Sequence, residues 1–170
     1  GYLPGSPERI ALKDELIRQS NEIIEIPCII NGVEVYTNNV VEQVMPHNHS
    51  HVIARVHMAG ENEVNDAIQA SLDAHEAWSS MPWEARSAIF LKASELLRGE
   101  YRAKINASTM INQSKTCHQA EIDSACELID FWRFNAFYAR QIYEDLQPTV
   151  SPSSMWNSSE VRPLEGFVFS

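Results

Sequence analysis

A long helical pattern over residues 118–146 places the strongest constraint on how this chain can fold. At about 100° per residue, Asp123, Glu127 and Asp130 fall on one narrow arc of that helix. A second arc is lined by apolar residues: Ile122, Cys126, Ile129, Trp132 and Ala136. Aromatic residues lie in or beside the acidic arc: Phe131, Phe134 and Phe137. Carboxylates beside aromatic side chains are typical of a face that meets solvent or a cationic ligand, so this face is the best functional candidate.

Further helices are predicted on both sides of the opening strands. Ser6-Pro7-Glu8 supplies an N-cap, a proline at the first helical position and an early acid, and predicts a helix that runs to about Ile26. Apolar residues at spacings of three and four predict helices that end at Pro82, before Gly99 and near Gln113: 61–81, 83–98 and 101–113. Together with residues 118–146 they predict a packed helical layer.

Short strands are expected between the first helix and this layer. Asn31-Gly32 predicts a hairpin turn between two short strands over residues 28–36. Residues 40–45 and 52–57 are further strand candidates, and a small antiparallel sheet is expected.

Three histidines, His47, His49 and His51, lie between those last two strands. In an extended segment they would point to one side, a spacing that could bind zinc. The Pro, Asn and Ser residues among them favour a solvated turn over 46–51, which is the interpretation we prefer.

Composition excludes several classes of protein. With 13 basic and 23 acidic residues the formal charge is −10, which disfavours binding to nucleic acid, and Lys and Arg form no basic patch. No membrane span is expected, because no apolar window reaches about 18 residues. The three cysteines, Cys28, Cys117 and Cys126, lack CxxC spacing and are expected to be buried structural thiols in a reducing compartment.

The last part of the chain changes character. Residues 147–163 predict a strand, a polar turn near Asn157 and a returning strand, which together form an exposed hairpin. Residues 164–170 resemble the start of another strand that the chain does not complete. The predicted fold class is thus a mainly helical α+β portion with short antiparallel strands and a C-terminal hairpin. Its expected units are 1–27, 28–60, 61–146, 147–163 and 164–170.

Several blocks of sequence resemble one family in order along nearly all of the chain. They are Met45-Pro46-His47, Met81-Pro82-Trp83, Gln119-Ala120-Glu121-Ile122-Asp123, Glu127-Leu128-Ile129-Asp130-Phe131 and Leu164-Glu165-Gly166-Phe167-Val168. These blocks are similar to the N-terminal part of the delta-1-pyrroline-5-carboxylate dehydrogenases, within the aldehyde dehydrogenase superfamily. The resemblance implies an α/β aldehyde-dehydrogenase-like fold in the parent enzyme. It also implies NAD-dependent oxidation of glutamate semialdehyde to glutamate in proline breakdown, usually in the mitochondrial matrix.

The resemblance also implies roles for residues of this chain. Glu127 matches a glutamate that lies near the amino group of the bound semialdehyde, and Phe131 would form one wall of that substrate site. No catalytic residue, cofactor-binding residue or metal ligand is assigned. The family's oxyanion asparagine, nucleophilic cysteine, general base and NAD-binding strands are expected after the matched portion. The chain alone is therefore expected to be inactive and to bind no NAD.

Two roles remain open for the chain. The resemblance implies a homo-oligomer that forms through residues 147–163 of an NAD-dependent enzyme. The alternative is a truncated, catalytically dead relative that docks into a larger assembly as a structural subunit. The chain departs from the family pattern at Asn112 and Ser114, where glycines are common, and over residues 157–160.

Overall fold

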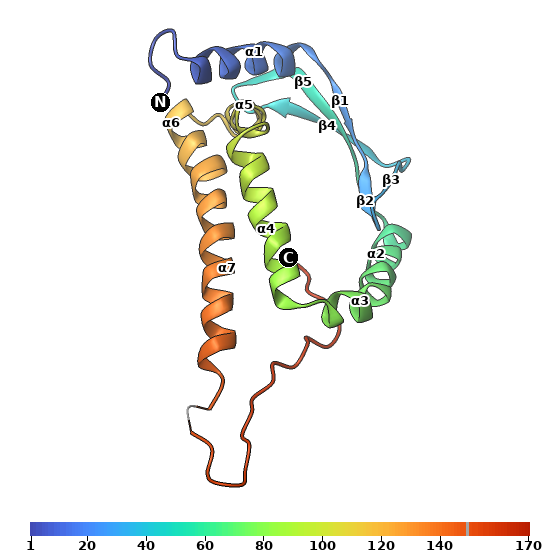
Figure 1. The fold of residues 1–170 in the computed structure, drawn as a ribbon. Coiled ribbons are helices and arrows are strands. Elements are labelled where there is room, and N and C mark those ends of the chain that lie inside the picture. The colour runs from blue at the N-terminus through green and yellow to red at the C-terminus, as the bar shows by residue number, and fades with distance from the viewer. Residues whose placement is uncertain (149) are drawn as a thin grey trace.

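The computed structural model describes residues 1–148 and 150–170. It combines a curved set of strands with a helical layer (Figure 1). The elements in chain order are α1 (Pro7–Asn21), β1 (Ile24–Ile26), β2 (Cys28–Ile30), β3 (Val33–Val35), β4 (Val40–Met45), β5 (Asn48–His57), α2 (Glu61–Asp73), α3 (His75–Ser80), α4 (Trp83–Arg98), α5 (Arg102–Gln113), α6 (Cys117–Ala120), a π-helical turn η1 (Glu121–Cys126) and α7 (Glu127–Asp145).

Helix α1 begins as predicted and ends earlier than predicted. The Ser6 hydroxyl accepts a hydrogen bond from the Arg9 amide at 3.3 Å, and Pro7 follows that N-cap. The prediction that this helix continues to Ile26 is wrong, because the helix ends at Asn21 and residues 24–26 form β1. β1 pairs in parallel with β5, and its isoleucines suit a strand better than a helix.

The hairpin and the antiparallel pair are confirmed. β2 and β3 pair around Asn31 and Gly32, whose φ angles of 51° and 75° are those of a tight hairpin turn. β4 and β5 pair antiparallel. The predicted turn over residues 46–51 is shorter than expected, because β5 already begins at Asn48, opposite Met45.

Two groups of buried residues join the layers. Met45, Ile53 and Ile111 pack between the sheet and α5. Leu97 on α4 packs with Ala125 and Ile129, where α4 and α7 lie side by side (Figure 1). The mainly helical α+β fold class is confirmed.

The helix predicted over residues 118–146 is interrupted by the π-helical turn η1. Ala120 and Ala125 are both fully buried, five residues apart, and Ile129 follows four residues later. A π-helical turn holds one extra residue, which rotates everything after it by roughly 100° relative to a continuous α-helix. The predicted apolar arc is therefore wrong at its start: Ile122 is 39% exposed and Cys126 is also exposed.

The residues after α7 form no strand in the part of the chain that the structure describes, so the strands predicted within 147–163 and 164–170 are not present. Pro148 and Pro152 lack amide donors, and among residues 1–148 and 150–170 no edge strand pairs with this segment. The Gln147 side chain nevertheless joins the two arms of the loop, since its amide donates to the Ser159 carbonyl at 2.9 Å. Thr149 lies outside the described residues, and the predicted unit boundaries stay predictions.

Candidate functional site

The candidate site is a shallow groove along the exposed face of α7. Its volume is about 330 Å³, and its walls are Glu127, Asp130, Phe131, Phe134, Asn135 and Tyr138. All six residues come from one helix and are exposed. The structure thus brings Glu127 and Phe131, the two predicted site residues, to the same groove.

The carboxylates of the predicted acidic arc differ in their surroundings. Asp123 forms an ion pair with Lys115 at 2.5 Å, outside the groove. Glu127 and Asp130 both line the groove, and within the described residues no Lys, Arg or His forms an ion pair with either of them. Their unneutralised charges favour a cationic group in the groove.

Aromatic rings supply the apolar part of the groove. Phe131 is 60% exposed. Phe134 stacks on Tyr138 with ring centroids 6.3 Å apart and an interplanar angle of 25°. Aromatic faces attract ammonium groups that also contact a carboxylate. The groove can therefore hold a small molecule that carries an amino group.

Contacts with α4 fix the opposite side of α7. Arg133 forms an ion pair with Glu95 at 2.5 Å. The hydrogen bond that Arg133 donates in this pair lowers the pKa of the exposed Glu95 carboxyl below its usual value, and a hydrogen bond from Arg98 adds a smaller effect in the same direction. Nearer the end of the helix, Tyr143 stacks on Trp83 with centroids 5.2 Å apart. α7 is thus held on one face while its groove face stays open.

Sequence reasoning missed a polar network centred on Glu121. The hydroxyl of Tyr2 and the side-chain amide of Asn106 each donate to the Glu121 carboxylate at 2.6 Å, and Arg102 forms an ion pair with it. Only 15% of the Glu121 side chain is exposed. An acid placed between Ala120 and Ile122 was the available sequence signal, but its partners come from distant segments.

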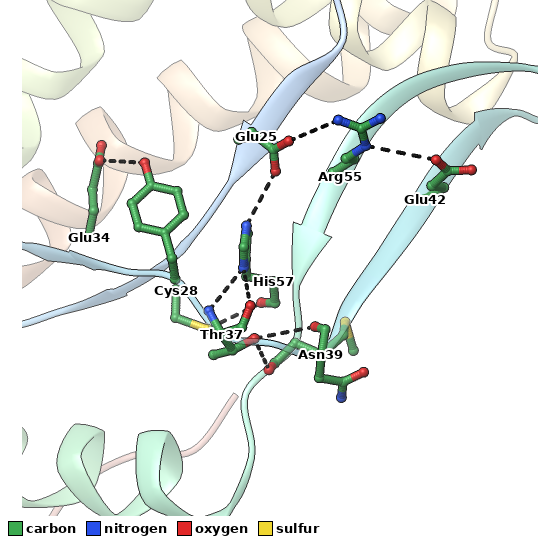
Figure 2. Close-up of polar contacts among 10 residues, drawn as sticks. Glu25, Cys28, Glu34, Thr37, Asn39, Glu42, Arg55 and His57 are labelled. Carbon is green, nitrogen blue, oxygen red and sulfur yellow. Dashed lines mark hydrogen bonds and ion pairs between the residues drawn. The ribbon is translucent and has the colours of Figure 1, made fainter.

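A second polar cluster surrounds His57 and links the strands (Figure 2). The Nε2 atom of His57 lies 3.3 Å from the Glu25 carboxylate, and its Nδ1 atom lies 2.9 Å from the Thr37 amide nitrogen. Arg55 lies between Glu25 and Glu42, at 3.4 and 3.8 Å. These residues belong to β1, β4, β5 and the segment after β3, so the cluster joins the three-stranded sheet to the segment that follows β3.

The three clustered histidines contact different elements. His47 Nδ1 lies 2.8 Å from the Ser114 hydroxyl, and His51 Nε2 lies 2.7 Å from the Ser20 carbonyl. His49 and His51 belong to β5, whereas His47 belongs to the turn before it. Among the described residues, no group of three His, Cys, Asp or Glu side chains could hold a metal ion.

The cysteines are only partly as predicted. Cys28 and Cys117 are half-buried, whereas Cys126 is exposed, so the expectation of three buried thiols is wrong for Cys126. The π-helical turn is the reason, because it rotates Cys126 away from α4. Burial raises the pKa of the Cys117 thiol, which disfavours the thiolate that a nucleophile requires. The Cys28 thiol donates to the His57 carbonyl at 3.3 Å.

Within the described residues, no helix combines the length and the apolar character that crossing a bilayer requires.

Comparisons with known proteins agree with the resemblance predicted from sequence. Residues 34–170 match the model of the aldehyde dehydrogenase family. The chain is 46% identical over 168 residues to a delta-1-pyrroline-5-carboxylate dehydrogenase of Agaricus bisporus, covering 98% of this chain and 31% of that protein. It is 47% identical over 167 residues to the mitochondrial enzyme of the same name from Homo sapiens, covering 98% of this chain and 29% of that protein.

A solved structure extends the likeness to the fold. The delta-pyrroline-5-carboxylate dehydrogenase of Mycobacterium tuberculosis, bound with NAD and cobalamin, superposes with a TM-score of 0.93 at 42% identity. The match covers 98% of this chain and 31% of that structure, so the chain spans less than a third of the length of these relatives. The match of the family model over most of the chain, together with these relatives, shows that this protein belongs to the aldehyde dehydrogenase family.

Proposed function

We propose that this chain is the substrate-recognition part of a dehydrogenase that oxidises glutamate semialdehyde to glutamate in proline breakdown. Relatives that share 46–47% of its residues are named delta-1-pyrroline-5-carboxylate dehydrogenases. The observation that carries the proposal is the groove on α7, where Glu127 lies beside the exposed ring of Phe131 and forms no ion pair within the described residues.

In this proposal Glu127 binds the ammonium group of the semialdehyde. A carboxylate is a charge-assisted acceptor for an ammonium donor. Phe131 lies one turn further along α7 and supplies an apolar wall for the carbon chain. Asp130 adds a second negative charge to the groove, which further favours a substrate that carries an amino group.

Oxidation of an aldehyde by this route needs a thiolate, oxyanion donors, a base and a hydride acceptor. The half-buried Cys117, with its raised pKa, is a poor nucleophile, and the Cys28 thiol donates a hydrogen bond to the His57 carbonyl. The Cys126 thiol donates a hydrogen bond to the Glu121 carboxylate at 3.5 Å, outside the groove. Within the described residues we therefore assign binding of the substrate, and no catalytic step, to this chain.

NAD is the cofactor that family membership suggests, and it would accept the hydride. Dinucleotide sites require a parallel strand, a glycine-rich turn and a helix N-terminus that receives the pyrophosphate. The parallel pair β1 and β5 is joined through β2, β3 and β4, and no helix crosses between them in the described part of the chain. The described residues therefore do not fit an NAD site.

The proposal is tested with Glu127→Gln in the native-length protein, assayed by NAD reduction with glutamate semialdehyde. We expect KM to rise about 10- to 100-fold, since a hydrogen bond to a charged group contributes about 1.5–3 kcal/mol. The KM for 5-oxopentanoate, which has the same length and no amino group, should change by less than about threefold.

The matched control is Glu144→Gln, which removes an exposed carboxylate from the same helix, where it pairs with Arg140. We expect it to leave both KM values unchanged. The substrate proposal is overturned if the wild-type protein does not oxidise glutamate semialdehyde. The role of Glu127 is overturned if its replacement affects both aldehydes alike.

We further propose that residues 147–163 contribute to an interface between subunits. Met155 and Trp156 in this segment are 63% and 90% exposed, and large apolar side chains with such exposure are typical of contact surfaces. The alternative, docking into a larger assembly of other proteins, would use the same surface. Trp156→Ser should lower the oligomeric state measured by light scattering if the partner is a second copy.

A mitochondrial location is proposed from relatives such as the Homo sapiens and Dictyostelium discoideum proteins, which are named mitochondrial.

A further inference from the structure

We propose that Glu121 is a positioning residue, which holds the π-helical turn and thereby sets the direction of Glu127. This inference rests on the proposed function for its substrate. The Glu121 carboxylate lies outside the groove, and within the described residues it forms no hydrogen bond or ion pair with a groove residue. Glu121 and Cys126 are the first and last residues of η1, and Glu127 follows directly.

The turn η1 sets which side chains of α7 face outward. Because η1 accommodates one extra residue, every side chain after it is rotated by roughly 100° relative to an uninterrupted helix. Ala125 and Ile129 then face α4, while Glu127 and Phe131 face the groove. Without the extra residue in this turn, a different set of side chains would face outward.

Hydrogen bonds from outside the helix stabilise the turn η1. An isolated π-helical turn is rare because it gives up regular i→i−4 bonding, so contacts from outside the helix are needed to hold it. Glu121 supplies them. Its carboxylate accepts from Tyr2 at 2.6 Å, from Asn106 at 2.6 Å and from the Arg102 Nε at 3.3 Å.

A contact within η1 closes the turn itself. The Cys126 thiol donates to the Glu121 carboxylate at 3.5 Å, which joins the first and last of the six residues of the turn. Next to it, the hydroxyls of Thr109 and Ser124 lie 2.6 Å apart and join the middle of η1 to α5. Asn106 is fully buried and uses its amide nitrogen twice, towards Tyr2 and Glu121, while its Oδ1 has no partner among the described residues. The amide is thus oriented for the carboxylate at the cost of its own acceptor.

The test compares Glu121→Gln with Glu127→Gln in the native-length protein. Glutamine keeps the shape of the side chain but loses the charge that holds Arg102. We expect a rise in KM for glutamate semialdehyde of about tenfold, with KM for 5-oxopentanoate changed by less than about threefold. Because both changes act on the same contact, the double variant should differ from Glu127→Gln alone by less than about threefold.

Hydrogen exchange provides a readout that does not depend on activity. In Glu121→Gln the amides of residues 121–126 should exchange at least about tenfold faster, while those of residues 131–140 keep their rates. Glu144→Gln is the control and should change neither region. Unchanged exchange in residues 121–126 overturns the inference, whether or not the protein oxidises the semialdehyde. So does a KM that rises equally for both aldehydes, since that pattern indicates general loss of structure.

Tyr2→Phe keeps the test decisive if Glu121→Gln does not fold. It removes one hydrogen bond to Glu121 and leaves the charged pair intact. We expect an effect of the same pattern and smaller size, about threefold in KM for glutamate semialdehyde, together with faster exchange in residues 121–126. A Tyr2→Phe protein identical to the wild type in both measurements would contradict the positioning role.

Discussion

Two carboxylates six residues apart, Glu121 and Glu127, have opposite surroundings. Glu121 is largely buried and accepts hydrogen bonds from Tyr2, Asn106, Arg102 and Cys126. Glu127 is exposed, lines a groove and forms no ion pair within the described residues. A carboxylate whose bonding capacity is already filled stabilises the fold, whereas one left open is available to a ligand. The partners of an acidic side chain, more than its residue type, therefore separate structural acids from candidate binding acids.

The largest expected effect on stability comes from removing the Glu121 carboxylate. Glu121→Ala should destabilise the native-length protein by about 3 kcal/mol, because Arg102 and Asn106 lose their shared acceptor. This value is at the low end for a broken buried pair, since 35% of the Arg102 side chain is exposed. Urea denaturation measures the change. A loss below about 0.5 kcal/mol would mean that the Glu121 network does not stabilise the fold.

The register of the π-helical turn predicts the next largest effect. Ala125 is fully buried, so Ala125→Leu should overfill the contact with α4 and destabilise the protein by about 1–3 kcal/mol. Ile122→Ala, on the exposed side, should cost less than about 1 kcal/mol. In a continuous α-helix Ile122 would lie on the buried face instead of Ala125, and Ile122→Ala would then be the more destabilising change. Thermal unfolding of the two variants side by side therefore tests whether η1 forms.

The pH dependence of stability tests how α7 is held to α4. Hydrogen bonds from Arg133 and then Arg98 lower the pKa of Glu95 in the folded state, relative to its usual value of 4.5. A lowered folded-state pKa contributes stability that is fully present above the unfolded value and is lost as the pH falls through the folded value. The urea concentration at the midpoint of unfolding should fall between about pH 5 and pH 3 in the wild type. In Glu95→Gln this fall should be smaller, because the titrating carboxyl is absent. The same fall in wild type and variant would contradict the pairing.

The smallest expected effect on stability comes from removing the charge of the exposed Glu127. Glu127 and Asp130 are like charges three residues apart on one helix, a pair that is slightly destabilising. Glu127→Gln should leave the free energy of unfolding unchanged or raise it by about 0.2–0.5 kcal/mol. Urea denaturation without substrate measures this. A clear loss of stability would indicate that Glu127 has a structural partner.

Local sequence patterns were sufficient for much of the fold. Ser6 and Pro7 start α1, Asn31 and Gly32 form the hairpin, and Gly99 follows the end of α4, as expected from their backbone preferences. The assignment of Glu127 and Phe131 to a substrate site follows from the family resemblance, whereas their placing one turn apart on a helix follows from the local pattern. These features depend on neighbours within a few positions, and a sequence records those neighbours directly.

Long-range contacts decided the rest. β1 forms because β5 offers a parallel partner, whereas within the described residues no strand pairs with the segment after α7. The π-helical turn depends on Tyr2 and Asn106, which lie 119 and 15 residues away from Glu121. Local patterns were enough to predict the hairpin and most of the helical segments, but not the end of α1 or the turn η1. The open face of α7 depends on long-range contacts, because one extra residue in η1 rotates every later side chain and the contacts that hold η1 come from distant segments.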